Sequence, residues 1–333
     1  MTSLKRNNQN IVHGPDDGKS PAWGQRILNG AWRAAVLLPK ATVLVGVIAL
    51  HAADLLVPND SFESPVVPAV TPYAGPEVDI WEKTAQPAWY DPSKNSDTPW
   101  SYLMGTFYNV PFPGQTIDNC HGRQAAFLFA LPEAGLFQDY DSTPSHALNA
   151  VFKPGNLYTL TVAVIGGGGG MKSGATLQLA LYYRDGASNK VTVAATTITN
   201  STDAFPTSTH FVDYHVEVPA TELTDPWAGK HIGIQLLSTT AFELAGGYWD
   251  LDHVRLTQTQ LPRISAVQAN TNLLSFTLES EPGLIFQILS TTNLANPFDS
   301  WPVLNTVTNV TGEVTFSDSI AGPGQRFYRA RQL

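Results

Sequence analysis

The stretch from Ile80 to Phe112 is rich in flat aromatic side chains, which proteins use to bind sugar rings. A sugar ring has an apolar C–H face, and an exposed tryptophan or tyrosine ring offers a matching surface. Trp89, Tyr90 and Trp100 lie in the most polar part of this stretch, so we predict that they are exposed and bind ligand. The alternative is that these aromatics fill the core, because large aromatic side chains are usually at least partly buried.

Other reactive residue types carry no local catalytic signature. Cys120 is the only cysteine, so it cannot form an intrachain disulfide or a thiolate metal site. The run from Gly166 to Ser173 imitates a phosphate-binding loop, but Met171 replaces a required glycine and a predicted strand follows in place of a helix. The histidines have no metal-ligand spacing. A pair of catalytic carboxylates for glycoside hydrolysis is assembled in space and leaves no such signature.

Composition favours an exported β protein. Only 14% of the 333 residues are charged and 43% are hydrophobic, while threonine, serine, asparagine, glycine and proline are abundant. Low charge with many turn formers and β-branched residues is typical of extracellular β-sandwiches. The net charge of -9 counts against nucleic acid as a partner, because phosphate binding needs clustered lysine and arginine.

The N-terminal residues 1–53 are predicted to be a secretory signal peptide. Basic residues precede an apolar stretch, which is uninterrupted from Ala41 to Leu50 and is followed by Ala52 and Ala53. This stretch is much shorter than the roughly 20 residues that span a bilayer. We therefore expect cleavage after Ala52 or Ala53, no membrane span afterwards, and a secreted or cell-envelope location.

The elements that must position these residues are strands. Period-two alternation and short β-branched runs, separated by glycine, proline, asparagine and aspartate, predict antiparallel sheets packed as a sandwich. The strands expected most clearly lie at residues 158–165, 175–183, 190–199, 211–218, 231–238 and 248–257. The first domain is predicted to span residues 54–257. A polar linker at 258–263 and a small β-sandwich-like domain at 264–333 follow it.

Two motifs frame the first domain and give it a family resemblance. The opening segment from Val57 to Pro65 contains Asn-Asp-Ser-Phe-Glu, and the closing segment from Tyr248 to Leu256 contains Trp-Asp-Leu-Asp-His-Val. Together they resemble the first and last strands of calcium-binding jelly-roll modules. Carbohydrate-binding modules and the Stig-type cyclases share this frame. The resemblance implies an all-β fold, a jelly-roll β-sandwich, over about Leu55 to Thr257.

The same resemblance implies a structural calcium ion, Ca2+. Glu63 from the opening strand and Asp252 from the closing strand would be its ligands, since calcium takes six to eight oxygens. Strand alternation would place Asp252 on the core side with Val254 and Leu256. Two departures from the family pattern stand out: His253 replaces an aspartate and Asp60 replaces a glycine. Asp250 is either a substitute ligand or solvated, and Glu63 and Asp252 are alternatively ordinary strand-end acids.

Three functions are compatible with these features. The first is a non-catalytic exported module that binds a polysaccharide or cell-surface polymer. The second is a structural protein of the envelope or matrix. The third is a cyclase-like enzyme, which requires an apolar pocket that holds a carboxylic acid of raised pKa. The sequence favours the first, and it names no catalytic residue.

Overall fold

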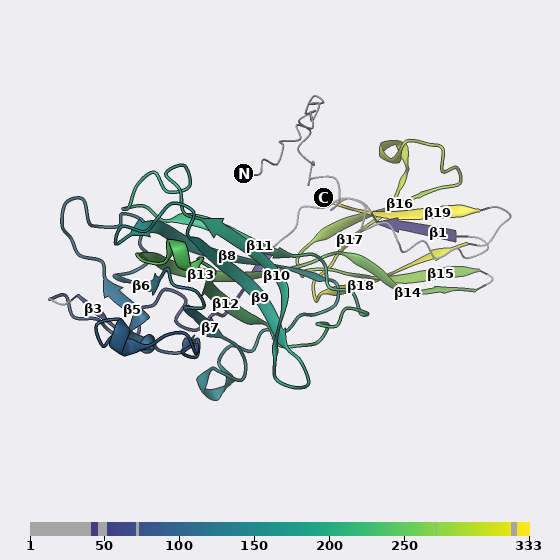
Figure 1. Ribbon diagram of the computed structural model, residues 1–333. Helices are drawn as coiled ribbons and strands as arrows, with labels where there is room; N and C mark the ends of the chain where they lie inside the picture. The colour runs from purple at the N-terminus through teal and green to yellow at the C-terminus, as the bar shows by residue number, and fades with distance from the viewer. Residues whose placement is uncertain (1–40, 46–51, 71–72, 271, 321–324) are drawn as a thin grey trace, which may run out of the picture.

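Strands make up nearly all the regular structure of the chain (Figure 1). The computed structural model describes residues 41–45, 52–70, 73–270, 272–320 and 325–333. Within them there is no α-helix, and the helical turns are short 3-10 segments such as Trp100–Leu103. No helix in this described part has the length and apolarity that crossing a membrane requires. The prediction of an all-β chain is confirmed.

The first sandwich consists of two sheets. Its larger sheet has the order β11-β8-β13-β6-β5-β3, with β2 beside β13, and its smaller sheet has the order β10-β9-β12-β7-β4. The larger sheet comprises β2 (Ala52–Leu55), β3 (Ala74–Gly75), β5 (Met104–Tyr108), β6 (Gln124–Phe129), β8 (Asn156–Gly168), β11 (Val212–Val218) and β13 (Tyr248–Gln260). The smaller comprises β4 (Glu82–Lys83), β7 (Gly135–Gln138), β9 (Thr176–Arg184), β10 (Lys190–Thr199) and β12 (Gly233–Ser238).

Alternating apolar side chains from both sheets form the core of this sandwich. Leu160 and Val162 of β8 meet Leu179 and Leu181 of β9, together with Leu236 of β12, in one buried cluster. Successive strand residues point to opposite faces, so every second residue of β8 contributes to this core. This arrangement confirms the predicted jelly-roll β-sandwich.

The first and last strands of the sandwich are neighbours, as the frame requires. β2 pairs antiparallel with β13, with Leu55 opposite Leu256 and Ala53 opposite Gln258. β13 continues to Gln260, which pairs with Asn156 of β8. The predicted linker at 258–263 was therefore wrong for residues 258–260, because these polar residues complete the ladders of β2 and β8.

A second, smaller sandwich follows directly. Only Leu261 and Pro262 separate β13 from β14. Its sheets have the orders β14-β15-β18 and β1-β19-β16-β17, and a separate core contains Leu278, Phe286 and Tyr328. Its strands are β1 (Ala41–Val45), β14 (Arg263–Ala269), β15 (Leu273–Glu279), β16 (Ile285–Thr291), β17 (Val303–Thr308), β18 (Glu313–Ser319) and β19 (Arg326–Gln332).

The predicted signal peptide falls mostly outside the described residues. Residues 1–40 and 46–51 are not among them. Residues 41–45 form β1, which pairs in parallel with β19 of the second sandwich.

A bulge in β13 reverses the side on which its residues point. Trp249 and Leu251 belong to the main core, and so do Val254 and Leu256, although the two pairs differ in parity. The ladder shifts register between Asp252 and Arg255, because the strand holds an extra residue there. Asp252 therefore points away from the main core, and its expected placement beside Val254 and Leu256 was wrong.

Candidate functional site

A pocket of about 590 Å³ lies on the outer face of the larger sheet, the face that points away from the smaller sheet. Its lining is largely aromatic and aliphatic, with contributions from β5, β6, β8 and β13, and includes Phe107, Phe112, Phe127, Phe129, Ile165 and Tyr248. The apolar residues of this face arise from the same alternation that fills the main core. A strand with apolar residues on both faces must be covered on both sides.

A glycine shapes one wall of this pocket. A Cβ atom added at Gly168 would lie 2.4 Å from the ring of Tyr248, far closer than van der Waals contact. Glycine at this position therefore lets the Tyr248 ring lie against the backbone of β8, which leaves the space beside the ring open.

Asp250 is the one acidic side chain among the residues that line the pocket. It lies between Phe127 of β6 and Ile165 of β8 across the two ladders. The side chain is half-buried, and its Oδ1 atom accepts no hydrogen bond from any described residue. Burial among apolar neighbours disfavours the charged carboxylate and raises the pKa of Asp250 to about 8.

This arrangement keeps a carboxylic acid protonated at neutral pH in front of an apolar space. Such a group can donate a hydrogen bond or a proton to a bound molecule. Asp250 therefore lines the pocket, apart from the segment of residues 121–124 that Glu63 and Asp252 contact. One sequence signal could have revealed it: Asp250 and Asp252 share a face of β13, opposite strands that are apolar on that face.

Two of the three aromatics predicted to be exposed are buried. Trp100 and Tyr90 are each 4% exposed, whereas Trp89 is 37% exposed. The Trp100 indole donates to the carbonyl of Thr84, and the Tyr90 hydroxyl donates to the carbonyl of Thr98. Burial is possible because backbone carbonyls satisfy both polar atoms. The expected exposure was wrong for Tyr90 and Trp100, and the proposed binding role of the three residues stays a prediction.

Glu63 and Asp252 approach the same short segment, residues 121–124, from two sides. Glu63 Oε1 accepts hydrogen bonds from the backbone N–H groups of Arg123 and Gln124, each at 2.7 Å. Asp252 accepts from the backbone N–H of His121 at 2.6 Å and of His253 at 2.7 Å. Burial raises the pKa of Asp252 to about 7, even though both N–H groups favour its charged form.

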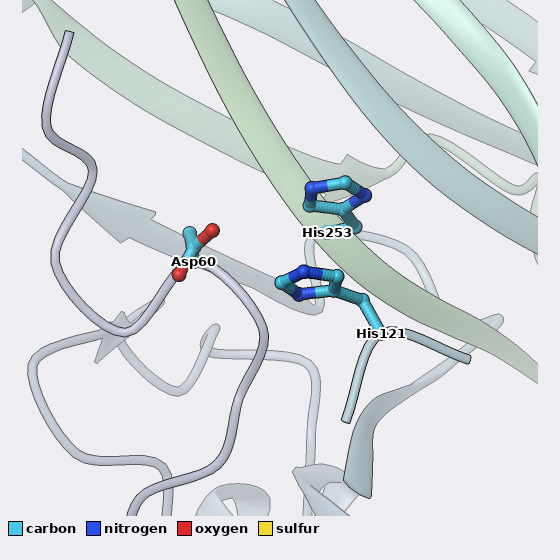
Figure 2. Close-up of side chains that lie close together, drawn as sticks. All are labelled: Asp60, His121 and His253. Carbon is cyan, nitrogen blue, oxygen red and sulfur yellow. The ribbon is translucent and has the colours of Figure 1, made fainter. Parts of the chain in front are cut away.

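A second cluster lies directly beside Asp252 (Figure 2). One ligand atom each of Asp60, His121 and His253 lies within 4.8 Å of the others. The two imidazole rings stack with their centroids 3.9 Å apart and their planes at 5°. Burial lowers the pKa of His253, and the positive charges of Arg255 and His121 act in the same direction.

The cluster of Asp60, His121 and His253 fits calcium poorly. Calcium prefers a cage of oxygens, whereas imidazole nitrogen suits zinc, copper, iron and nickel. In the part of the chain that the structure describes, the cluster of Asp60, His121 and His253 is the one group of three such ligands. Glu63 and Asp252 together already accept four backbone hydrogen bonds, three from residues 121–124 and one from His253. The departures at Asp60 and His253 were visible in the sequence, but His121, far away in the chain, was not connected with them.

The family to which this frame belongs follows from comparison with known proteins. The HpiC1-like family, described as HpiC1 cyclase, matches residues 53–257. The chain belongs to the HpiC1-like family. The match covers both framing motifs, the segment of residues 121–124 and nearly all of the first sandwich, up to Thr257 in β13, so it confirms the resemblance to the Stig-type cyclases.

The chain is also similar to solved structures of low sequence identity. A cyclase from Fischerella sp. TAU is 23% identical, and the alignment covers 62% of this chain and 98% of that one with a TM-score of 0.44. A Stig cyclase from the same organism, in complex with (3Z)-3-(1-methyl-2-pyrrolidinylidene)-3H-indole, is also 23% identical. That alignment covers 63% of this chain and 99% of the other, with a TM-score of 0.44. The CBM22-1 xylan-binding domain of Xyn10C from Paenibacillus barcinonensis is 15% identical. Its alignment covers 47% of this chain and 83% of that domain, with a TM-score of 0.29. No curated protein matches the chain.

Proposed function

We propose that this protein binds an apolar small molecule in the outer-face pocket and cyclises it, with Asp250 as the general acid. The observation that carries the proposal is the Asp250 carboxyl group, which has an unpartnered oxygen and faces an aromatic-lined pocket. Membership of a family described as a cyclase family agrees with it. This reading takes precedence over the non-catalytic binding module that the sequence favoured.

The reaction requires little beyond the pocket and one acid. Asp250 transfers its proton to a carbon–carbon double bond or carbonyl oxygen of the substrate, and the resulting cation is attacked by a second double bond. Loss of a proton from a carbon next to the cationic centre of the cyclised intermediate to the Asp250 carboxylate restores the acid, so the product is an isomer of the substrate. The pocket walls hold the substrate folded and exclude water, which would otherwise trap the cation.

Asp250→Asn tests the catalytic part of the proposal. Asparagine has nearly the same shape but no transferable proton. The probe reaction is the acid-catalysed closure of citronellal to isopulegol, measured by gas chromatography. We expect the variant to lose about 10²–10⁴-fold in rate, the usual contribution of a general acid. Asp203→Asn, on an exposed carboxyl group elsewhere, is the control. A rate in Asp250→Asn equal to that of the wild type would refute the role of Asp250.

Pocket binding is tested separately. Ser208 is exposed and lines the pocket, whereas its neighbour Thr207 is exposed and does not line it. Ser208→Trp should therefore fill the pocket, and Thr207→Trp should leave it open. We expect calorimetry with indole to show at least tenfold weaker binding to Ser208→Trp than to Thr207→Trp. Equal affinities would mean that the apolar ligand binds elsewhere.

A second candidate function is binding of polysaccharide at Trp89. Its ring packs edge-on against Phe242, which is 60% exposed, with the ring centroids 4.9 Å apart. An exposed aromatic pair offers the flat surface that sugar rings favour. Affinity electrophoresis in xylan should show retardation that Trp89→Ala removes and Tyr102→Ala, at another exposed aromatic, does not. Unchanged mobility of the wild-type protein in the polysaccharide gel would dismiss this candidate.

We also retain two expectations from the sequence as proposals. The first is a stabilising calcium ion near Glu63 and Asp252; it is supported by the two carboxylates at one segment, and a rise of the melting temperature in calcium over EDTA should disappear in Glu63→Gln. The second is export with cleavage after Ala52 or Ala53. N-terminal sequencing of secreted protein tests it, and a mature chain that starts elsewhere would contradict it.

A further inference from the structure

We propose that Asp60, His121 and His253 form a binding site for a divalent transition-metal ion of the zinc class. The three residues come from distant parts of the sequence: the loop after β2, the segment before β6, and the bulge of β13. Figure 2 shows nitrogen atoms of both imidazole rings on the side that faces the Asp60 carboxylate.

The ligand types point to zinc rather than calcium. Two imidazoles and one carboxylate form a set known from zinc enzymes, in which water or substrate takes the fourth position. Asp60 and His253 also line a pocket of about 470 Å³, so space for a fourth ligand lies next to the cluster. Asp60 and His253 are half-buried and His121 is exposed, so an ion can reach the three ligands from solvent.

Backbone contacts already hold the three ligands in place. Asp252 accepts hydrogen bonds from the backbone N–H of His121 with one oxygen and from that of His253 with the other. The carbonyl of Asp60 accepts from the backbone N–H of Val254 at 2.8 Å, which ties the Asp60 loop to β13. Asp252 is thus a positioning residue that fixes the main chain beneath both imidazoles.

The ligand atoms lie close to the spacing that a bound ion requires. Ligand atoms around tetrahedral zinc lie roughly 3.3 Å apart, given zinc–nitrogen bonds of about 2.0–2.1 Å. The atoms of the cluster lie within 4.8 Å of one another. The stacked rings must tilt so that their lone pairs converge on one point, since parallel rings direct them along parallel lines. Side-chain torsions supply this tilt without a change in the strands.

The experiment uses the untagged full chain, stripped with EDTA and titrated with zinc chloride by calorimetry. We expect one equivalent of zinc to bind and Asp60→Asn, His121→Ala and His253→Ala each to weaken binding at least tenfold. His210→Ala, an exposed histidine paired with Asp118, is the matched control and should bind like the wild type. Cobalt chloride should give visible absorption bands typical of tetrahedral coordination, and Asp60→Asn should remove them.

Several outcomes would overturn the site. If Asp60→Asn binds zinc as tightly as the wild type, the proposed site is wrong. This test holds even if the histidine variants fail to fold, because asparagine keeps the shape of the aspartate that it replaces. Stoichiometric calcium binding that Asp60→Asn and His121→Ala abolish, with no zinc binding, would assign the cluster to calcium instead. Zinc binding lost equally in His210→Ala would place the ion elsewhere on the chain.

Discussion

At the scale of the residue, the decisive feature is where β13 places its two acids. Asp250 faces an apolar pocket and Asp252 lies beside the histidine cluster, although only one residue separates them. Asp252 is buried and Asp250 is half-buried, and neither is bonded to a cationic side chain among the described contacts, so each keeps its proton to an unusually high pH. β13 thus carries both the proposed proton donor, Asp250, and the residue that positions the proposed metal ligands, Asp252.

The pKa of Asp250 has a consequence for stability. In the unfolded chain an aspartate loses its proton near pH 3.9. In the folded chain Asp250 holds its proton to about pH 8. Between these values the folded state binds more protons, so its stability falls as the pH rises, and the fall ends above pH 8. Asp250→Asn cannot ionise and lacks this loss.

We therefore expect the free energy of unfolding of Asp250→Asn to increase relative to that of the wild type as the pH rises from 5 to 9. The gain should be about 2 kcal/mol, below the full value that the shift implies, because solvent in the pocket screens part of the charge. Urea unfolding at both pH values measures it. A difference between the two proteins that is the same at pH 5 and pH 9 would contradict the raised pKa.

At the scale of the element, the segment of residues 121–124 connects the loop after β2 with β13. Glu63 lies in that loop, because β2 ends at Leu55, so its expected place on the opening strand was wrong. Glu63 reaches the backbone of this segment from one side and Asp252 from the other. Gly122 has a φ of 102°, and a Cβ atom there would lie 2.4 Å from Glu63 Oε1. Glycine is therefore required both by the backbone conformation and by the close approach of the carboxylate.

Gly122→Ala should destabilise the protein by about 2–3 kcal/mol, the combined cost of backbone strain and of displaced hydrogen bonds. Gly114→Ala is the matched control, because Gly114 also has a positive φ but an added Cβ atom meets nothing within 4 Å. It should cost only about 1 kcal/mol of strain. Equal losses in urea unfolding would show that the contact of Glu63 with this segment contributes nothing.

The sequence predicts elements well and side-chain neighbours across elements poorly. The expected strands at residues 158–165, 190–199 and 211–218 coincide closely with β8, β10 and β11, because alternation is a local property. The bulge at His253 was not predicted, since it depends on the partner strand, and it changes the face on which Asp252 lies. His121 joined the metal cluster through folding alone. Tyr90 and Trp100 were misplaced because polar neighbours in sequence do not reveal a carbonyl partner in space.

At the scale of the whole molecule, the chain consists of two sandwiches with separate cores. Leu236 lies in the first core and Leu278 in the second, and both are fully buried. Among the described residues, the backbone N–H of Gln260 in the first sandwich donates a hydrogen bond to Glu281 in the second. All residues of the pocket and of the metal cluster belong to the first sandwich. The second sandwich is therefore expected to unfold independently of the site.

Leu236→Ala and Leu278→Ala should each destabilise one sandwich by about 2–5 kcal/mol, the usual cost of a leucine cavity. Calorimetric unfolding should show two transitions, and each variant should lower a different one. Indole binding should survive in Leu278→Ala at temperatures between its two transitions. A single transition that both variants lower equally would mean that the sandwiches fold as one unit.

The most direct test of the account is the ionisation of Asp250 itself. Infrared difference spectra between the wild type and Asp250→Asn isolate the stretch of the protonated carboxyl group during a titration from pH 4 to 10. The account predicts that this band persists at pH 7 and disappears with a midpoint of about 8. A midpoint near pH 4 would show an ordinary charged aspartate in the pocket and would contradict its assignment as the proton donor.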